Sequence, residues 1–126
     1  MSKKFAFLMA AVTVIGAAPA LAQNAVCVEP VAMAVTVNGK TASSDQMRAA
    51  MTQARDFVAK SDTYQQCVAD DLEAKKQAAA KAGTPFDDQL EQVAKAKVAA
   101  NQQAKDKLVA DTNAQIVLYK QQTASK

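Results

Sequence analysis

The chain has 126 residues, a formal net charge of +3, 2 Cys, and neither His nor Trp. This length fits one small domain. Without His, the sequence lacks the side chain most often used for general acid–base catalysis and for binding transition metals. We therefore expect no enzyme, no catalytic residue, no cofactor and no metal site.

The first 22 residues have the three parts of a secretory signal peptide. Lys3 and Lys4 precede an apolar run over residues 5–18, and Ala20-Leu21-Ala22 supplies a cleavage site of small residues. The run is shorter than the roughly 20 residues that span a bilayer. We expect cleavage after Ala22 and a periplasmic location. The remaining chain has 13 basic and 12 acidic side chains, a balance that argues against binding to nucleic acid.

Both cysteines, Cys27 and Cys67, follow this cleavage site. In an oxidising compartment an even number of cysteines in a short chain usually means a disulfide. A bridge between them would close a loop of about 40 residues and stabilise the fold by about 4 kcal/mol in the chain-entropy model. The alternatives are an intermolecular bridge or free thiols. No Cys-x-x-Cys motif indicates a redox-active pair.

Residues 23–42 are expected to form an extended N-terminal arm. From Val26 to Val37 the apolar residues alternate as in a strand, and Asn38-Gly39 is a turn signal. Pro30 and the lack of a second strand argue against a sheet. The sequence therefore predicts an arm that lies on helices.

A long first helix is predicted over residues 44–82. Ser43 and Gln46 have the spacing of a capping box, and Gly83 suits a left-handed C-terminal cap. Between them, apolar or small residues recur every three or four positions, which is the period of an amphipathic helix. Ser61-Asp62-Thr63 offers a second possible N-cap, so a break near Ser61 is the alternative.

A second helix is predicted over residues 85–121. Thr84 is expected to cap it, with Pro85 at the first helical position and Asp87 completing a capping box. Phe86, Leu90, Val93, Val98, Leu108, Val109, Ile116 and Tyr119 continue the helical spacing. Acidic residues at its start and Lys120 near its end complement the helix dipole.

The tight turn at Gly83 predicts an antiparallel hairpin, so the fold class is all-α, with a helical domain over residues 43–126. Facing positions should have numbers that sum to about 167. This register places Met47 beside Tyr119, Met51 beside Ile116, and Phe57 beside Leu108 and Val109. It also brings Ser61 and Gln65 to Asn101, a polar layer that is either a tolerated weak spot or a device that fixes the register of a coiled-coil-like seam.

Two helices bury apolar side chains on one side only, so part of the apolar stripe is expected to contact a partner. The side chains of the run Ile116–Tyr119 cover most of the helix circumference, and Val117 and Leu118 point away from the hairpin face. This pattern indicates a second partner surface or a membrane contact, and the alternative is contact with the arm. The acidic pairs Asp70-Asp71 and Asp87-Asp88 are interpreted as a solvated face and a dipole complement. The predicted interaction surface consists of Met47, Met51, Phe57, Tyr64, Ile116, Val117, Leu118 and Tyr119.

Several of these features occur together: Cys27-x-x-Pro30, the turn at Gly39, a helix start near Met47, and Phe57 followed by Tyr64-x-x-Cys67. In this the chain resembles a group of small uncharacterised exported proteins of proteobacteria. The resemblance covers most of the chain after the signal peptide. It implies export and a disulfide, and it carries over no catalytic residue.

The sequence therefore favours a non-enzymatic periplasmic structural or interaction protein that acts through an amphipathic helical hairpin. The expected partner is a second copy, in a dimer that forms a four-helix bundle, or another envelope protein. Membrane contact is not favoured. The alternative is a holdase-like periplasmic chaperone or envelope-stress factor, although the balanced charge offers no basic tip that would retain acidic clients.

Overall fold

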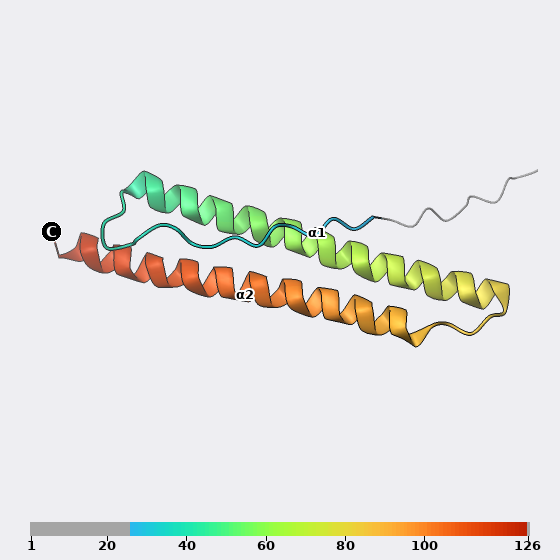
Figure 1. Cartoon of the computed structure of the whole chain (residues 1–126). Helices are drawn as coiled ribbons and strands as arrows, with labels where there is room; N and C mark the ends of the chain where they lie inside the picture. Colours follow the sequence, from blue (N-terminus) through green and yellow to red (C-terminus); the bar gives the residue numbers. More distant parts are fainter. Residues whose placement is uncertain (1–25, 126) are drawn as a thin grey trace, which may run out of the picture.

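The computed structural model describes residues 26–125, so the predicted signal peptide and its cleavage site after Ala22 lie outside the described residues. The described part contains two helices and no strand: α1, Ser44–Ala82, has 39 residues, and α2, Asp88–Ala124, has 37 residues. The helices lie side by side and run in opposite directions, and the arm runs lengthwise along them (Figure 1). The predicted all-α hairpin is confirmed.

Both ends of α1 are where the sequence placed them. The Gln46 N–H donates to Ser43 Oγ over 3.2 Å, and the Ser43 N–H donates to Gln46 Oε1 over 2.8 Å, which completes the capping box. At the other end Gly83 has a φ of 66°, the left-handed conformation that glycine adopts without steric cost. Since α1 is continuous from Ser44 to Ala82, the helix does not break near Ser61.

The predicted start of α2 is wrong by three residues, because Asp87 rather than Thr84 caps the helix. The Asp87 carboxylate accepts from the Gln89 N–H over 2.9 Å. The Thr84 N–H instead donates back to Ala79 O over 3.0 Å, so Thr84 completes the C-terminal motif of α1 and Pro85 lies in the loop. The helix also runs to Ala124 instead of 121, since neither Gly nor Pro stops it earlier.

The predicted register is confirmed by two clusters of buried side chains. Ala54, Phe57 and Leu108 form one, and Tyr64, Val68 and Ala94 form the other. An ion pair of 2.6 Å between Lys105 Nζ and Asp62 Oδ1 joins the helices in the same register. Phe57 meets Leu108 in the first cluster, and Tyr64 and Val68 meet Ala94 in the second, so the seam buries apolar side chains from both helices.

A polar layer separates the two clusters. Ser61 and Asn101 are 0% and 1% exposed. Asn101 Nδ2 donates to Ser61 Oγ over 3.3 Å, and Gln65 Nε2 donates to Asn101 Oδ1 over 2.9 Å. These bonds pair the buried polar groups with one another, so the layer carries no cost of unsatisfied hydrogen-bond partners and favours one register.

The arm is extended over residues 26–38, and the predicted disulfide between Cys27 and Cys67 is present. At the far end, Gly39 approaches α2 so closely that a Cβ atom there would lie 2.1 Å from the Gln115 carbonyl oxygen. Only glycine fits this contact. The arm is therefore fixed to α1 at one end and to α2 at the other.

An ion-pair cluster near the loop end predicts a pH dependence of stability. Glu91 of α2 binds Lys95 Nζ over 2.8 Å and Lys76 Nζ of α1 over 2.9 Å. The hydrogen bonds from Lys95 and Lys76 lower the pKa of Glu91 from 4.5 to about 2. Because the unfolded state binds this proton more tightly, Glu91 stabilises the fold above pH 4.5, and this contribution is lost as the pH falls towards 2.

The measurement is urea unfolding at several pH values between 5 and 2. In this range the free energy of unfolding should fall less steeply for Glu91→Gln than for the wild type. Glu73→Gln is the matched control, since Glu73 is exposed and accepts a hydrogen bond from Gln77 of its own helix. Equal slopes for wild type and Glu91→Gln would contradict the assignment.

Candidate functional site

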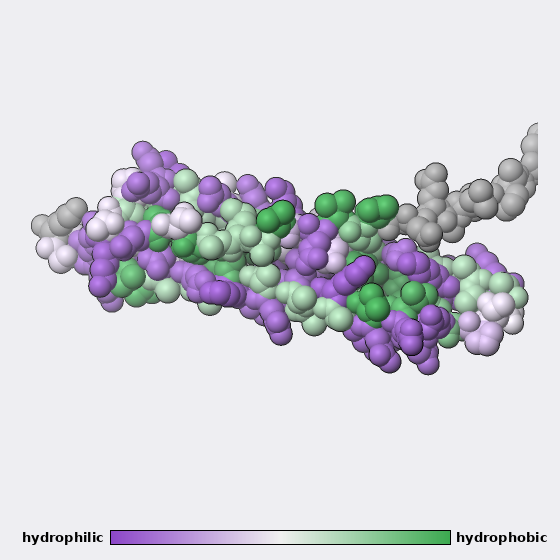
Figure 2. Space-filling view, in the orientation of Figure 1, coloured by the Kyte–Doolittle hydropathy of each residue, from purple (hydrophilic) through white to green (hydrophobic). Residues whose placement is uncertain are grey.

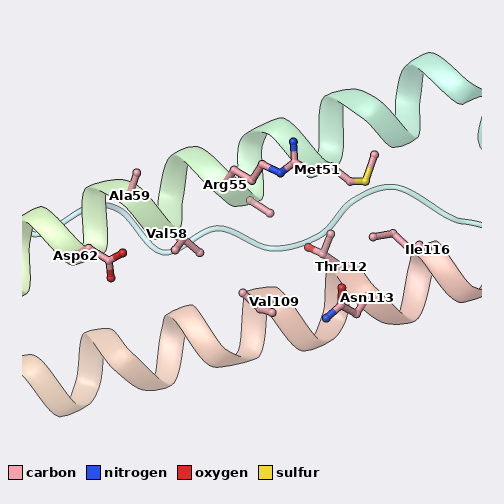
Figure 3. Close-up of a pocket in the computed structure, with 10 residues that line it drawn as sticks. Met51, Arg55, Val58, Ala59, Asp62, Val109, Thr112, Asn113 and Ile116 are labelled. Carbon is pink, nitrogen blue, oxygen red and sulfur yellow. The ribbon is translucent and has the colours of Figure 1, made fainter.

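The side of the hairpin opposite the arm carries an open groove between α1 and α2. Its cavity measures about 350 Å³, and no residue of the arm lines it. Figure 3 shows side chains from both helices around this space. The residues that define the open groove are Met51, Ala54, Arg55, Val58, Ala59 and Asp62 of α1 and Val109, Thr112, Asn113 and Ile116 of α2.

Only two of the eight predicted surface residues, Met51 and Ile116, line the open groove. Tyr119 is half-buried in an adjoining pocket that Met51 and Ile116 also line, which extends the apolar surface towards the start of α1. Val117 is 54% exposed but lies outside the groove. The groove therefore uses part of the predicted stripe.

The other predicted surface residues lie inside the molecule or under the arm. Met47, Phe57 and Tyr64 are at most 4% exposed, so they offer no surface to a partner in this arrangement. Leu118 is half-buried beside the arm, since a Cβ atom at Gly39 would lie 3.0 Å from its Cβ. Leu118 therefore contacts the arm, which was the alternative interpretation of this residue in the sequence.

Sequence reasoning missed Arg55, Val58, Thr112 and Asn113 as groove residues. A signal was present, because residues 51, 55, 58 and 62 recur every three or four positions along one flank of α1. Val109 was placed in the seam, yet it is 40% exposed. What the sequence did not reveal was the flank of each helix that the arm covers.

Polar groups around the open groove have few partners of their own. Within the described part of the chain, Arg55 and Asn113 make no hydrogen bond or ion pair. Asp62 is held by Lys105. The groove is thus an apolar surface with an unpaired cation and an unpaired amide at its rim, a composition typical of binding sites.

Thr112 is only 5% exposed, and its hydroxyl has no hydrogen-bond partner among residues 26–125. Other helical threonines differ: the hydroxyls of Thr52 and Thr63 donate to the carbonyl four residues earlier, over 3.0 Å in each case. An unpaired buried hydroxyl destabilises a fold by about 1–3 kcal/mol. The Thr112 hydroxyl, at the floor of the open groove, therefore lowers the free energy of unfolding of the fold.

We expect Thr112→Val to raise the free energy of unfolding by about 1 kcal/mol, because it replaces the unpaired hydroxyl with a methyl group of similar size. Urea unfolding measures the change. Thr52→Val is the control, and it should lower stability slightly since it removes a hydrogen bond. A destabilised Thr112→Val protein would show that the hydroxyl has a partner after all.

The acidic residues Asp70, Asp71 and Asp87 have structural partners. Asp70 accepts from Gln66, Asp71 accepts from Lys75, and Asp87 caps α2. Among the described residues, no group of three or more His, Cys, Asp or Glu side chains could hold a metal ion. In the same part of the chain, neither helix has a stretch that is long and apolar enough to cross a membrane.

Further exposed apolar side chains lie outside the open groove. Val26, Val28 and Val31 of the arm are 87%, 78% and 85% exposed, and Val93 of α2 is 52% exposed. Figure 2 shows the hydrophobic atoms of one face in several groups, with hydrophilic atoms between them. Apolar surface is therefore present on the arm as well as in the open groove.

Comparison with known proteins found no matching family model, no similar curated protein and no similar solved structure.

Proposed function

We propose that the protein is an exported, non-enzymatic structural or interaction module of the periplasm, and that it acts through its open groove. The observation that carries this proposal is the groove itself. The arm covers one side of the seam, while Met51, Val58, Val109 and Ile116 line a cavity of about 350 Å³ on the other side. Accessible apolar surface that crosses two helices is typical of protein interfaces.

The occupant that we propose is a second copy of the chain. Two hairpins that meet groove to groove form a four-helix bundle, the arrangement in which paired amphipathic helices bury both sides of their seams. A two-fold axis would place the open groove of each copy, with Val58 and Ile116, against the open groove of its partner. The exposed arms would then lie on the outside of the dimer.

Sedimentation velocity of two glutamate variants tests this interface. Ile116→Glu places a charge in the open groove, so we expect it to shift the protein from dimer to monomer. Val117→Glu is the matched control: it is the next residue of the same helix, is 54% exposed and lies outside the groove. The same sedimentation coefficient for both variants would overturn the proposed interface.

The proposed location has its own test. Mass spectrometry of the protein from a periplasmic fraction should find a chain that begins at Gln23 and contains the Cys27–Cys67 disulfide. This disulfide supports export, because such bridges persist in oxidising compartments. Unprocessed chain confined to the cytoplasm would contradict the proposed location.

A further inference from the structure

The arm is fixed to the helices mainly at its two ends. Cys27 is bonded to Cys67 of α1, and the Gly39 N–H donates to Gln115 Oε1 of α2 over 2.9 Å. The turn there is closed by the Ala42 N–H, which donates to Asn38 O over 2.9 Å. Between these ends, residues 28–37 make no hydrogen bond within the described part of the chain. This stretch is therefore held against the helices by side-chain packing and not by hydrogen bonds.

That packing involves few side chains. Cys27, Pro30, Val35 and Val37 are half-buried, whereas Val26, Val28 and Val31 point outwards and are at least 78% exposed. Val35 packs against the first buried cluster and Cys27 against the second. The surface beneath the arm, which we call the arm groove, consists of Ala54, Phe57, Leu108, Tyr64, Val68 and Ala94.

The arm itself shows which chemistry this groove accepts. Its occupant is an extended segment with apolar side chains that face the helices, and its backbone from residue 28 to residue 37 bonds to nothing in the described structure. A groove that binds its occupant only through shape and apolar side-chain contacts does not require one particular sequence. Another extended apolar segment of similar shape can therefore bind there.

We propose that the arm groove is a second binding surface, which takes an extended apolar segment of another polypeptide in place of the arm once the Cys27–Cys67 disulfide is reduced. While the disulfide is intact, the arm is tethered at both ends and keeps the groove filled. Reduction removes the covalent link between the arm and α1, while the turn at Gly39 still holds the other end of the arm, so the arm can swing away from Tyr64 and Phe57. Ala54 contributes to both surfaces, and the other residues of the open groove lie outside the arm groove.

The reductant is a dithiol. One of its thiolates attacks a sulfur of the Cys27–Cys67 bond, which forms a mixed disulfide and releases the other cysteine as a thiolate. The second thiol of the reductant then attacks the mixed disulfide, releases the remaining cysteine and closes the reductant's own disulfide. The protein gains two electrons and two protons, and the dithiol loses them.

The test uses a fluorescent peptide with the sequence of residues 26–38 and Cys27→Ser. We expect it to bind the dithiothreitol-reduced protein at least tenfold more tightly than the oxidised protein by fluorescence anisotropy. In the reduced protein the arm is tethered at Gly39 alone and competes at an effective concentration of about 1 mM. In the oxidised protein both ends are tethered, so the arm competes more strongly with the peptide. Equal affinity for the two forms would overturn the proposal.

Two variant peptides test the mode of binding. Val35→Asp with Val37→Asp changes the side chains that face the helices, so this peptide should lose binding. Val28→Asp with Val31→Asp changes outward side chains and should bind as the parent does. If both pairs weaken binding equally, the peptide does not occupy the arm groove in the orientation of the arm.

Tyr64 reports whether the arm has left. Burial raises the pKa of Tyr64, and the nearby Glu29 carboxylate of the arm raises it further. The chain has 2 Tyr, so in Tyr119→Phe the phenolate absorbance follows Tyr64 alone. On reduction the pKa of Tyr64 should fall towards its ordinary value of 10.0. An unchanged pKa would mean that the arm stays in place, against the proposal.

A variant with the disulfide intact makes the test independent of the stability that the disulfide supplies. The oxidised Val35→Asp/Val37→Asp protein should bind the parent peptide, and the oxidised Val28→Asp/Val31→Asp protein should not. Two other results would overturn the proposal: loss of helical circular dichroism on reduction, or a reduced protein that exchanges arms into a stable dimer and refills its own groove.

Discussion

Cys67→Ser is expected to lower the free energy of unfolding by up to about 4 kcal/mol, because the disulfide closes a loop of 40 residues and restricts the unfolded chain. This is a large part of the stability of a small fold, which is about 5–15 kcal/mol for typical domains. Both helices should remain at 25 °C, since direct contacts between α1 and α2, such as those of Asn101 with Ser61 and of Lys105 with Asp62, do not involve the arm.

Urea unfolding followed by circular dichroism at 222 nm measures this effect. The double variant Cys27→Ser/Cys67→Ser is the control, because it excludes any contribution from the lone Cys27 thiol of the single variant. Both variants should match the reduced wild-type protein. An unchanged midpoint after loss of the disulfide would refute the assigned stabilising role.

Asn101→Ala is expected to lower the free energy of unfolding by about 3 kcal/mol. The substitution removes the amide that Ser61 and Gln65 bond to in the polar layer. The Ser61 hydroxyl, 0% exposed, would then be buried without that partner. A small cavity adds to the cost.

Asn113→Ala is the matched control for this prediction. Asn113 lies on the same helix, is exposed and makes no hydrogen bond within the described residues, so its loss should change stability by less than about 0.5 kcal/mol. Equal effects of Asn101→Ala and Asn113→Ala on urea unfolding would show that the polar layer does not stabilise the seam.

Local signals in the sequence were sufficient for α1 and for the register of the hairpin. The Ser43–Gln46 capping box and Gly83 act within a few residues, so their geometry follows from the amino acids present. Once Gly83 fixes the turn, the helical period determines which residues face each other. Phe57 beside Leu108 and Ser61 beside Asn101 follow from that period alone.

The start of α2 could not be assigned in the same way, since Thr84-Pro85 is compatible with two structures. Thr followed by Pro can begin a helix, and it can also follow the C-terminal motif of the preceding one. In the structure the Thr84 N–H donates to Ala79 O, so Thr84 completes the C-terminal motif of α1 instead of beginning α2. Asp87 then takes the cap three residues later.

The position of the open groove could not be predicted, because it depends on contacts between residues far apart in the sequence. Its position follows from the flank that the arm covers, which is set by the Cys27–Cys67 bond and by the Gly39 contact with Gln115. The alternation of valines in the arm also left open which ones face the helices. In the structure Val35 faces inwards, while Val28 and Val31, on either side of Pro30, face outwards.

In the proposed dimer, the open groove of one chain closes on that of a second copy. Light scattering of the oxidised protein over a concentration series tests it most directly, because the molar mass requires no variant and no assumed partner. A dimer that persists as the protein is diluted is the predicted result. A molar mass of one chain at every concentration would contradict self-association as the way in which the groove is covered.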